Sequence, residues 1–115
     1  MSIVLTDNNF EDQIIGSDKL SIIDFWATWC SPCVALGPTI DSLGRDYEGR
    51  INVGKLNVDE NPNVSIKYGV TNLPCVLFIM NGKVVDRHVG LAPKTVYDKK
   101  VKALLDKSVY GSNKV

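Results

Sequence analysis

The sequence lacks the features that would assign it to a membrane, secreted or nucleic-acid-binding class. It has only three cysteines and one histidine among 115 residues, and no apolar run is long enough to span a membrane. Thirteen basic and thirteen acidic residues cancel, and neither sign is gathered into a long run. We therefore expect neither a nucleic acid nor a membrane surface as a partner.

The cysteines are too few, and odd in number, for the disulfide framework of a small secreted domain. Residues 1–20 carry acidic and polar side chains where a signal sequence would be apolar. We therefore expect a cytoplasmic protein, in a compartment where a C-x-x-C pair is more often catalytic or metal-binding than structural. The length predicts one domain over residues 1–108, with a frayed tail over 109–115.

Predicted strands alternate with predicted helices along the chain. Apolar runs and turn residues predict strands over 2–5, 20–27, 51–58, 75–80 and 83–89. Apolar residues at helical spacing predict four helices. The first three end at Gly16, Tyr47 and Gly69, and the fourth begins at Pro93. This order predicts an α/β fold with a mixed, largely parallel sheet of about five strands.

The segment Trp29-Cys30-Ser31-Pro32-Cys33 joins a strand to a helix. Unpaired N–H groups and the positive dipole at a helix start stabilise a thiolate, so Cys30 is the candidate nucleophile, exposed at this end. Cys33 lies one turn further on the buried stripe, where it can resolve a mixed disulfide. The spacing predicts dithiol–disulfide exchange; chance occurrence and half of a zinc site are the alternatives.

Asp24 interrupts a strand that is otherwise apolar on both faces. A buried carboxylate costs several kcal/mol unless it is protonated or partnered, so we expect its pKa to be raised. A carboxyl group poised near neutrality below the thiols can take the proton of Cys33, through a water molecule. The alternative is a satisfied acid in the core. In the strand over 51–58, the alternation of side chains places Lys55 on the inward face. The alternative is a lysine at the edge whose ammonium group reaches solvent.

About the first 108 residues resemble the thioredoxin family. The matching residues are Asp24–Ala27, Trp29–Cys33, Pro38, Lys55–Asp59, Pro62, Tyr68–Val70, Leu73-Pro74, Asn81-Gly82 and Val89-Gly90. The resemblance implies the thioredoxin fold, a three-layer sandwich with the sheet between helices. It implies reversible reduction of protein disulfides without an organic cofactor, with thioredoxin reductase as electron donor. It also implies that Lys55 lies near Asp24.

The resemblance further implies an apolar rim that docks extended substrates. Its residues are Trp29, Ser31, Pro32, Leu73, Pro74, Gly90 and Leu91. Pro74 would follow a cis bond and present the backbone of Leu73 to a substrate strand; a trans proline at the start of a strand is the alternative.

Three residues depart from the family pattern. Ser31 stands where glycine is usual, Cys75 where threonine is usual, and Leu91 where a small residue is common. We hypothesise that Ser31 donates a hydrogen bond to the Cys30 thiolate or to the helix start and makes the protein more oxidising; an inert hydroxyl is the alternative. Cys75 is expected near Cys30, as an inert buried thiol or as a site of redox modulation.

The leading hypothesis is a monomeric oxidoreductase that uses Cys30 and Cys33 on disulfide-containing proteins. One alternative is a binding module in which the redox state gates docking to a dedicated partner. Another is a metal or iron–sulfur carrier that uses Cys30, Cys33 and Cys75.

Overall fold

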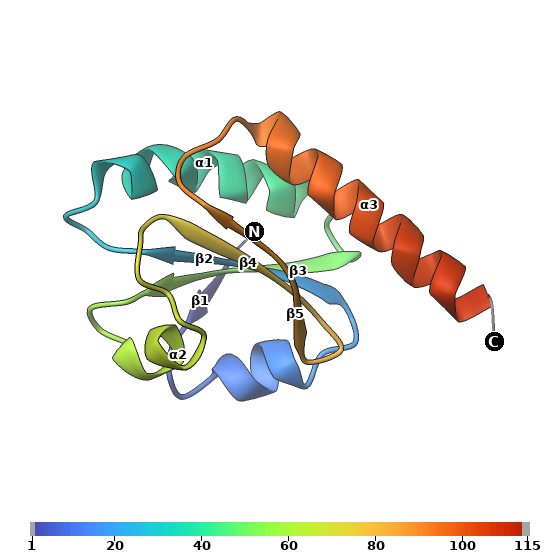
Figure 1. Ribbon diagram of the computed structural model, residues 1–115, viewed down its shortest axis with the longest axis horizontal. Coiled ribbons are helices and arrows are strands. Elements are labelled where there is room, and N and C mark those ends of the chain that lie inside the picture. The colour runs from blue at the N-terminus through green and yellow to red at the C-terminus, as the bar shows by residue number, and fades with distance from the viewer. Residues whose placement is uncertain (1, 114–115) are drawn as a thin grey trace.

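A single five-stranded sheet forms the centre of the protein (Figure 1). The structure is a computed structural model that describes residues 2–113. The strands lie in the order β1-β3-β2-β4-β5. Their bounds are Ile3–Leu5 for β1, Leu20–Trp26 for β2, Ile51–Asn57 for β3, Cys75–Met80 for β4 and Lys83–Val89 for β5.

The strand directions confirm a mixed, largely parallel sheet. Strand β3 pairs in parallel with both β1 and β2, whereas β4 pairs antiparallel with β2 and with β5. Only β4 of the described strands therefore runs against the others. Asn81 and Gly82 both have positive φ angles in the turn between β4 and β5, as the Asn-Gly sequence predicts for a two-residue hairpin.

Helices cover both faces of the sheet, which confirms the three-layer α/β architecture and its four helices. Helix α1 (Ser31–Asp46) and helix α3 (Lys94–Asn113) lie together on one side, as Figure 1 shows. The π-helix η1 (Glu11–Ile15) and helix α2 (Pro62–Lys67) lie on the other side. No helix within residues 2–113 is both long and apolar enough to cross a membrane.

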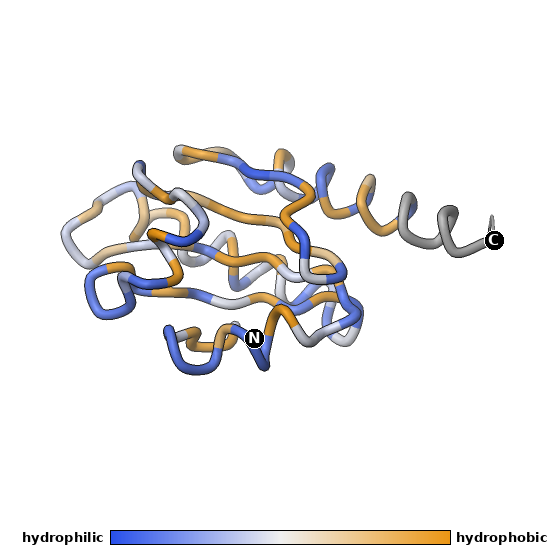
Figure 2. The backbone as a smooth tube through the Cα atoms, turned by 60° about the horizontal axis from the view of Figure 1, so that its bottom comes forward, coloured by the Kyte–Doolittle hydropathy of each residue, from blue (hydrophilic) through white to orange (hydrophobic). Residues whose placement is uncertain are grey.

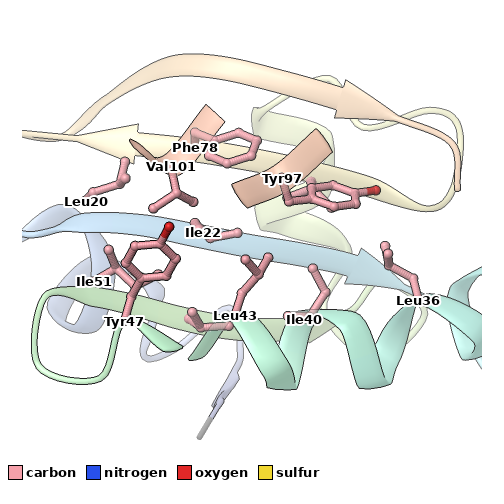
Figure 3. Close-up of a cluster of buried hydrophobic side chains, with 12 residues drawn as sticks. Leu20, Ile22, Leu36, Ile40, Leu43, Tyr47, Ile51, Phe78, Tyr97 and Val101 are labelled. Atoms are coloured by element: carbon pink, nitrogen blue, oxygen red, sulfur yellow. The ribbon is translucent and has the colours of Figure 1, made fainter. Parts of the chain in front are cut away.

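Two hydrophobic cores hold the layers together because β2 and β4 are buried on both faces. One core packs Ile22 and Phe78 of the sheet against Leu36 and Ile40 of α1 and Tyr97 of α3 (Figure 3). The second core joins the opposite face to η1 and α2. Figure 2 shows the apolar residues concentrated in these central strands. Alternation along β2 thus sends Asp24 and Ile22 to the same face, beneath α1.

Helix α3 is longer than the sequence suggested. It continues to Asn113, through most of the segment 109–115 that we expected to be a frayed tail. Residues 114 and 115 of that segment lie outside the described residues. The domain boundary at residue 108 stays a prediction.

Candidate active site

The two cysteines of the motif form a disulfide at the start of α1. Cys30 is the residue that precedes the helix, with an extended backbone, and Pro32 occupies its first turn. The Cα atoms of Cys30 and Cys33 lie 5.2 Å apart, within the usual span of a disulfide. The backbone N–H of Cys33 donates a hydrogen bond to the sulfur of Cys30 at 3.3 Å. The helix start thus provides the sulfur with a donor, as the sequence predicted.

Cys30 is more enclosed than expected, whereas Cys33 is buried as its place on the helix stripe predicted. Cys30, predicted to be exposed, has an exposed fraction of only 5%, and Cys33 has 2%. They form a small cluster with Ala27, against which Leu73 packs. Trp26 and Val58 pack against the same cluster, so side chains from three separate segments enclose Cys30.

Asp24 lies in the middle of β2 and is 1% exposed. Its Oδ1 atom has no hydrogen-bond partner among the described residues. Burial raises the pKa of Asp24 to about 7, and the nearby charge of Lys55 lowers it less than burial raises it. The structure therefore agrees with the prediction of a buried carboxyl group poised near neutrality.

A cavity of about 200 Å³ connects Asp24 with the resolving cysteine. Its lining residues are Asp24, Trp26, Cys33, Val34, Gly37 and Lys55. A cavity of this size, with the polar groups of Asp24 and Lys55 in an otherwise apolar wall, can hold water molecules. The carboxyl group and the Cys33 side chain thus share one compartment, in which a proton can pass between them through water.

Lys55 lies beside Asp24 on the neighbouring strand, where the two residues are register partners. The ammonium group of Lys55, however, pairs with Asp41 of α1, with Nζ 3.0 Å from Oδ1. Within residues 2–113, Lys55 makes no ion pair with Asp24. Lys55 and Asp24 are thus neighbours in the sheet, as expected, but the Lys55 ammonium group pairs with Asp41 instead.

Trp29 and Leu91 are large apolar residues of the predicted rim that are exposed, at 69% and 55%. The indole N–H of Trp29 donates a hydrogen bond to Oδ2 of Asp59 at 2.8 Å, which fixes the ring on the surface. Pro32 is exposed as well. Large exposed apolar side chains beside a reactive pair are typical of a protein-docking surface.

The Leu73-Pro74 bond is cis, as the resemblance implied. Pro74 is buried, and its carbonyl accepts a hydrogen bond from the N–H of Gly90 at 2.8 Å, which ties two parts of the rim together. Within the described chain, the backbone N–H and C=O of Leu73 make no hydrogen bond to another backbone group. A groove of about 390 Å³ runs beside Leu73 and Trp29. An extended segment can therefore pair with this backbone.

Ser31 is exposed at the first position of α1. Among residues 2–113, its hydroxyl group makes no hydrogen bond, and the donor to the Cys30 sulfur is the backbone of Cys33. The hypothesised effect of Ser31 on the Cys30 thiolate concerns the reduced form and stays a prediction.

Cys75 has a free thiol and is 1% exposed. It belongs to the core on the opposite face of the sheet, not to the cluster that contains Cys30. Burial raises the pKa of Cys75, although the Arg87 guanidinium, 3.8 Å from its sulfur, acts against this. The described residues contain no group of three or more His, Cys, Asp or Glu residues that could hold a metal ion. The structure thus shows a buried thiol, and the role of Cys75 stays a prediction.

Two residues that contact the site were missed by the sequence reasoning. Asp41 binds Lys55, and Asp59 binds Trp29. Asp41 could have been found from helix periodicity, because Cys33, Gly37 and Asp41 follow one another at intervals of four on one row of α1. Asp59 follows the strand that carries Lys55, so the parallel pairing of β2 and β3 places it near Trp29.

Comparison with known proteins agrees with this geometry. The thioredoxin family profile, described as "Thioredoxin", matches residues 1–103. The chain belongs to the thioredoxin family. It is 52% identical to a thioredoxin of Chlorobaculum thiosulfatiphilum over 96 residues, which cover 84% of this chain and 89% of the relative. It is also 52% identical to thioredoxin 2 of Chlorobaculum tepidum, with coverages of 84% and 88%. A chloroplastic M-type thioredoxin of Pisum sativum is 43% identical over 98 residues, 85% of this chain and 57% of the relative.

Family membership and the Cys30–Cys33 disulfide together identify the activity. Thioredoxins are protein-disulfide oxidoreductases, and this member has the C-x-x-C pair joined at the strand-to-helix junction. The chain is therefore a thiol–disulfide oxidoreductase with a redox-active Cys30–Cys33 centre.

Proposed function

We propose that the reduced protein attacks disulfides of other proteins through the thiolate of Cys30. A bond forms between the Cys30 sulfur and one substrate sulfur, and the other substrate sulfur leaves as a thiolate that takes up a proton. The observation that carries this assignment is the N–H of Cys33 at 3.3 Å from the Cys30 sulfur, because a donor at a helix start stabilises an anion there.

Cys33 completes the exchange. Its thiol gives a proton to the carboxylate of Asp24, through water in the shared cavity, and its sulfur then attacks the sulfur of Cys30. The mixed disulfide breaks, and the substrate sulfur that was bonded to Cys30 leaves as a thiolate and is protonated. The Cys30–Cys33 disulfide forms in the same step. The substrate has gained two electrons and the protein has lost two. The raised pKa of Asp24, about 7, suits this group to accept and return a proton near neutral pH.

Substrate docking uses the groove between Trp29 and Leu73. An extended substrate segment pairs with the unpartnered backbone of Leu73, and its apolar side chains contact Trp29 and Leu91.

Thioredoxin reductase restores the dithiol of Cys30 and Cys33, because it is the electron donor that membership of the thioredoxin family implies. The chain works as a monomer in the cytoplasm, where the thiol of Cys75 stays reduced. Sedimentation and cell fractionation test these last two assignments.

Replacement of each cysteine by serine tests the two roles. Cys33→Ser should still attack a protein disulfide but accumulate the mixed disulfide, visible on a non-reducing gel and by mass spectrometry. Cys30→Ser should form no such adduct, and its turnover should fall by at least about a thousandfold. Accumulation of the adduct by Cys30→Ser instead would reverse the assignment. A biological role that survives Cys30→Ser would favour the redox-gated binding module.

A further inference from the structure

The ammonium group of Lys55 lies against α1 instead of against its strand partner Asp24. Its Nζ is 3.0 Å from Oδ1 of Asp41. It also lies close to the helix backbone one turn earlier, because a Cβ added at Gly37 would be 3.6 Å from this Nζ. A methyl group at Gly37 would be in ordinary van der Waals contact with the ammonium group, which therefore lies directly against the turn that ends at Asp41.

Asp41 is itself held in place. The hydroxyl group of Ser2 donates a hydrogen bond to Oδ1 of Asp41 at 3.1 Å, so the same oxygen accepts from both Ser2 and Lys55. Partial burial acts to raise the pKa of Asp41, but the hydrogen bond and charge of Lys55 outweigh it and keep the pKa below its ordinary value. Asp41 is therefore ionised at neutral pH and forms a charged pair with Lys55.

Several titratable groups surround Asp24 on the elements packed against it. They are Lys55 of β3, Asp41 and Cys33 of α1, Tyr97 of α3 and, through the sheet, Cys75 of β4. Only Lys55 among them is a cation. Where its ammonium group lies therefore decides how much positive charge the Asp24 carboxylate meets, since the interaction of two charges falls with distance.

We propose that Asp41 is a positioning residue, which holds the Lys55 ammonium group against α1 and so sets how tightly Asp24 binds its proton. The inference extends the proposed proton transfer from Cys33 to Asp24. With Asp41 in place, Lys55 remains part of the cavity wall and its charge is shared with a second carboxylate. Without Asp41, the flexible lysine side chain can turn toward the unpartnered Oδ1 atom of its strand neighbour.

Asp41→Asn should lower the midpoint at which Asp24 titrates by about one pH unit, the lower end of the effect of a nearby opposite charge. The midpoint is measured in the oxidised protein from the carboxyl carbon chemical shift of Asp24 against pH. Asp41→Glu should restore it. Asp46→Asn, which removes another α1 acid with its own lysine partner, is the matched control and should leave the midpoint unchanged. Circular dichroism verifies that each variant is folded.

A double-mutant cycle separates positioning from the direct field of Asp41. In a Lys55→Gln background, Asp41→Asn should move the Asp24 midpoint by less than about a third as much. Equal shifts of the Asp24 midpoint in the two backgrounds would show that Asp41 acts only by its own charge. No shift in either background would show that Asp41 does not influence Asp24. Either outcome overturns the proposal. The rate of mixed-disulfide resolution in Asp24→Asn tests the proton-transfer role separately, because the titration midpoint does not depend on it.

Discussion

The backbone N–H of Cys33 points at the sulfur of Cys30, 3.3 Å away, in the first turn of α1. This donor belongs to the main chain, so it is present whatever residue stands between Cys30 and Pro32. When the disulfide is reduced, the same donor faces a thiolate, and a hydrogen bond to a charged acceptor is stronger than one to a neutral sulfur. The backbone of the helix start therefore supplies stabilisation that the sequence reasoning had assigned in part to Ser31.

Ser31→Ala should accordingly change the Cys30–Cys33 reduction potential by less than about 10 mV, which is roughly 0.5 kcal/mol for two electrons. The exposed hydroxyl group makes no hydrogen bond among the described residues, so its removal takes nothing from the disulfide form. The potential is measured by equilibration with a glutathione or dithiothreitol buffer. A shift of about 30 mV or more toward reducing values would restore the original hypothesis of a hydrogen bond from Ser31.

Asp24→Asn should stabilise the protein at alkaline pH. The pKa of Asp24 is about 7 in the folded protein against 3.8 for an ordinary aspartate, so the folded state retains the proton over this interval. Its contribution to stability is complete below about pH 4 and is lost as the pH rises through about 7, with a total of up to about 4 kcal/mol. Urea unfolding at about pH 4 and about pH 9 measures the difference. A gain from Asp24→Asn that is equal at both pH values would contradict this linkage.

The sequence predicted the sheet, its helices and the reactive pair because each depends on local patterns. The buried run of β2, the stripe of α1 and the Asn-Gly turn all follow from residues near one another in the chain. The misses are of a different kind. The enclosure of Cys30 and the direction of the Lys55 ammonium group depend on contacts between distant segments. Residue types and their spacing do not fix such contacts when a side chain has several possible partners.

Cys75 should be unreactive in the folded protein. In the oxidised form it is the one free thiol, 1% exposed, with its pKa raised by burial, so an aromatic disulfide reagent should label it at least about a hundredfold more slowly than in denaturant. Cys75→Ala should keep disulfide-reductase turnover within about twofold, because the thiol lies in the core opposite the active site. Rapid labelling, or a glutathione adduct in the mass spectrum of purified protein, would instead favour redox modulation.

Asp59→Ala should weaken the docking of protein substrates without slowing the chemistry. The Asp59 carboxylate holds the exposed indole of Trp29 by one hydrogen bond of 2.8 Å. Its loss frees a ring that a bound segment must then order again, at a cost of about 1 kcal/mol. We expect the KM for a protein disulfide to rise about three- to tenfold with kcat within about twofold, and the rate with a small aromatic disulfide to stay unchanged.

Matched variants separate the hydrogen bond from the charge of Asp59. Glu60→Ala removes the adjacent exposed acid and should leave the KM unchanged, because Glu60 makes no hydrogen bond to Trp29 among the described residues. Trp29→Phe keeps an aromatic ring but removes the N–H donor, so Asp59→Ala should add little to the KM in that background. If the effects of Asp59→Ala and Trp29→Phe simply add, Asp59 contacts the substrate itself and does not act through the indole.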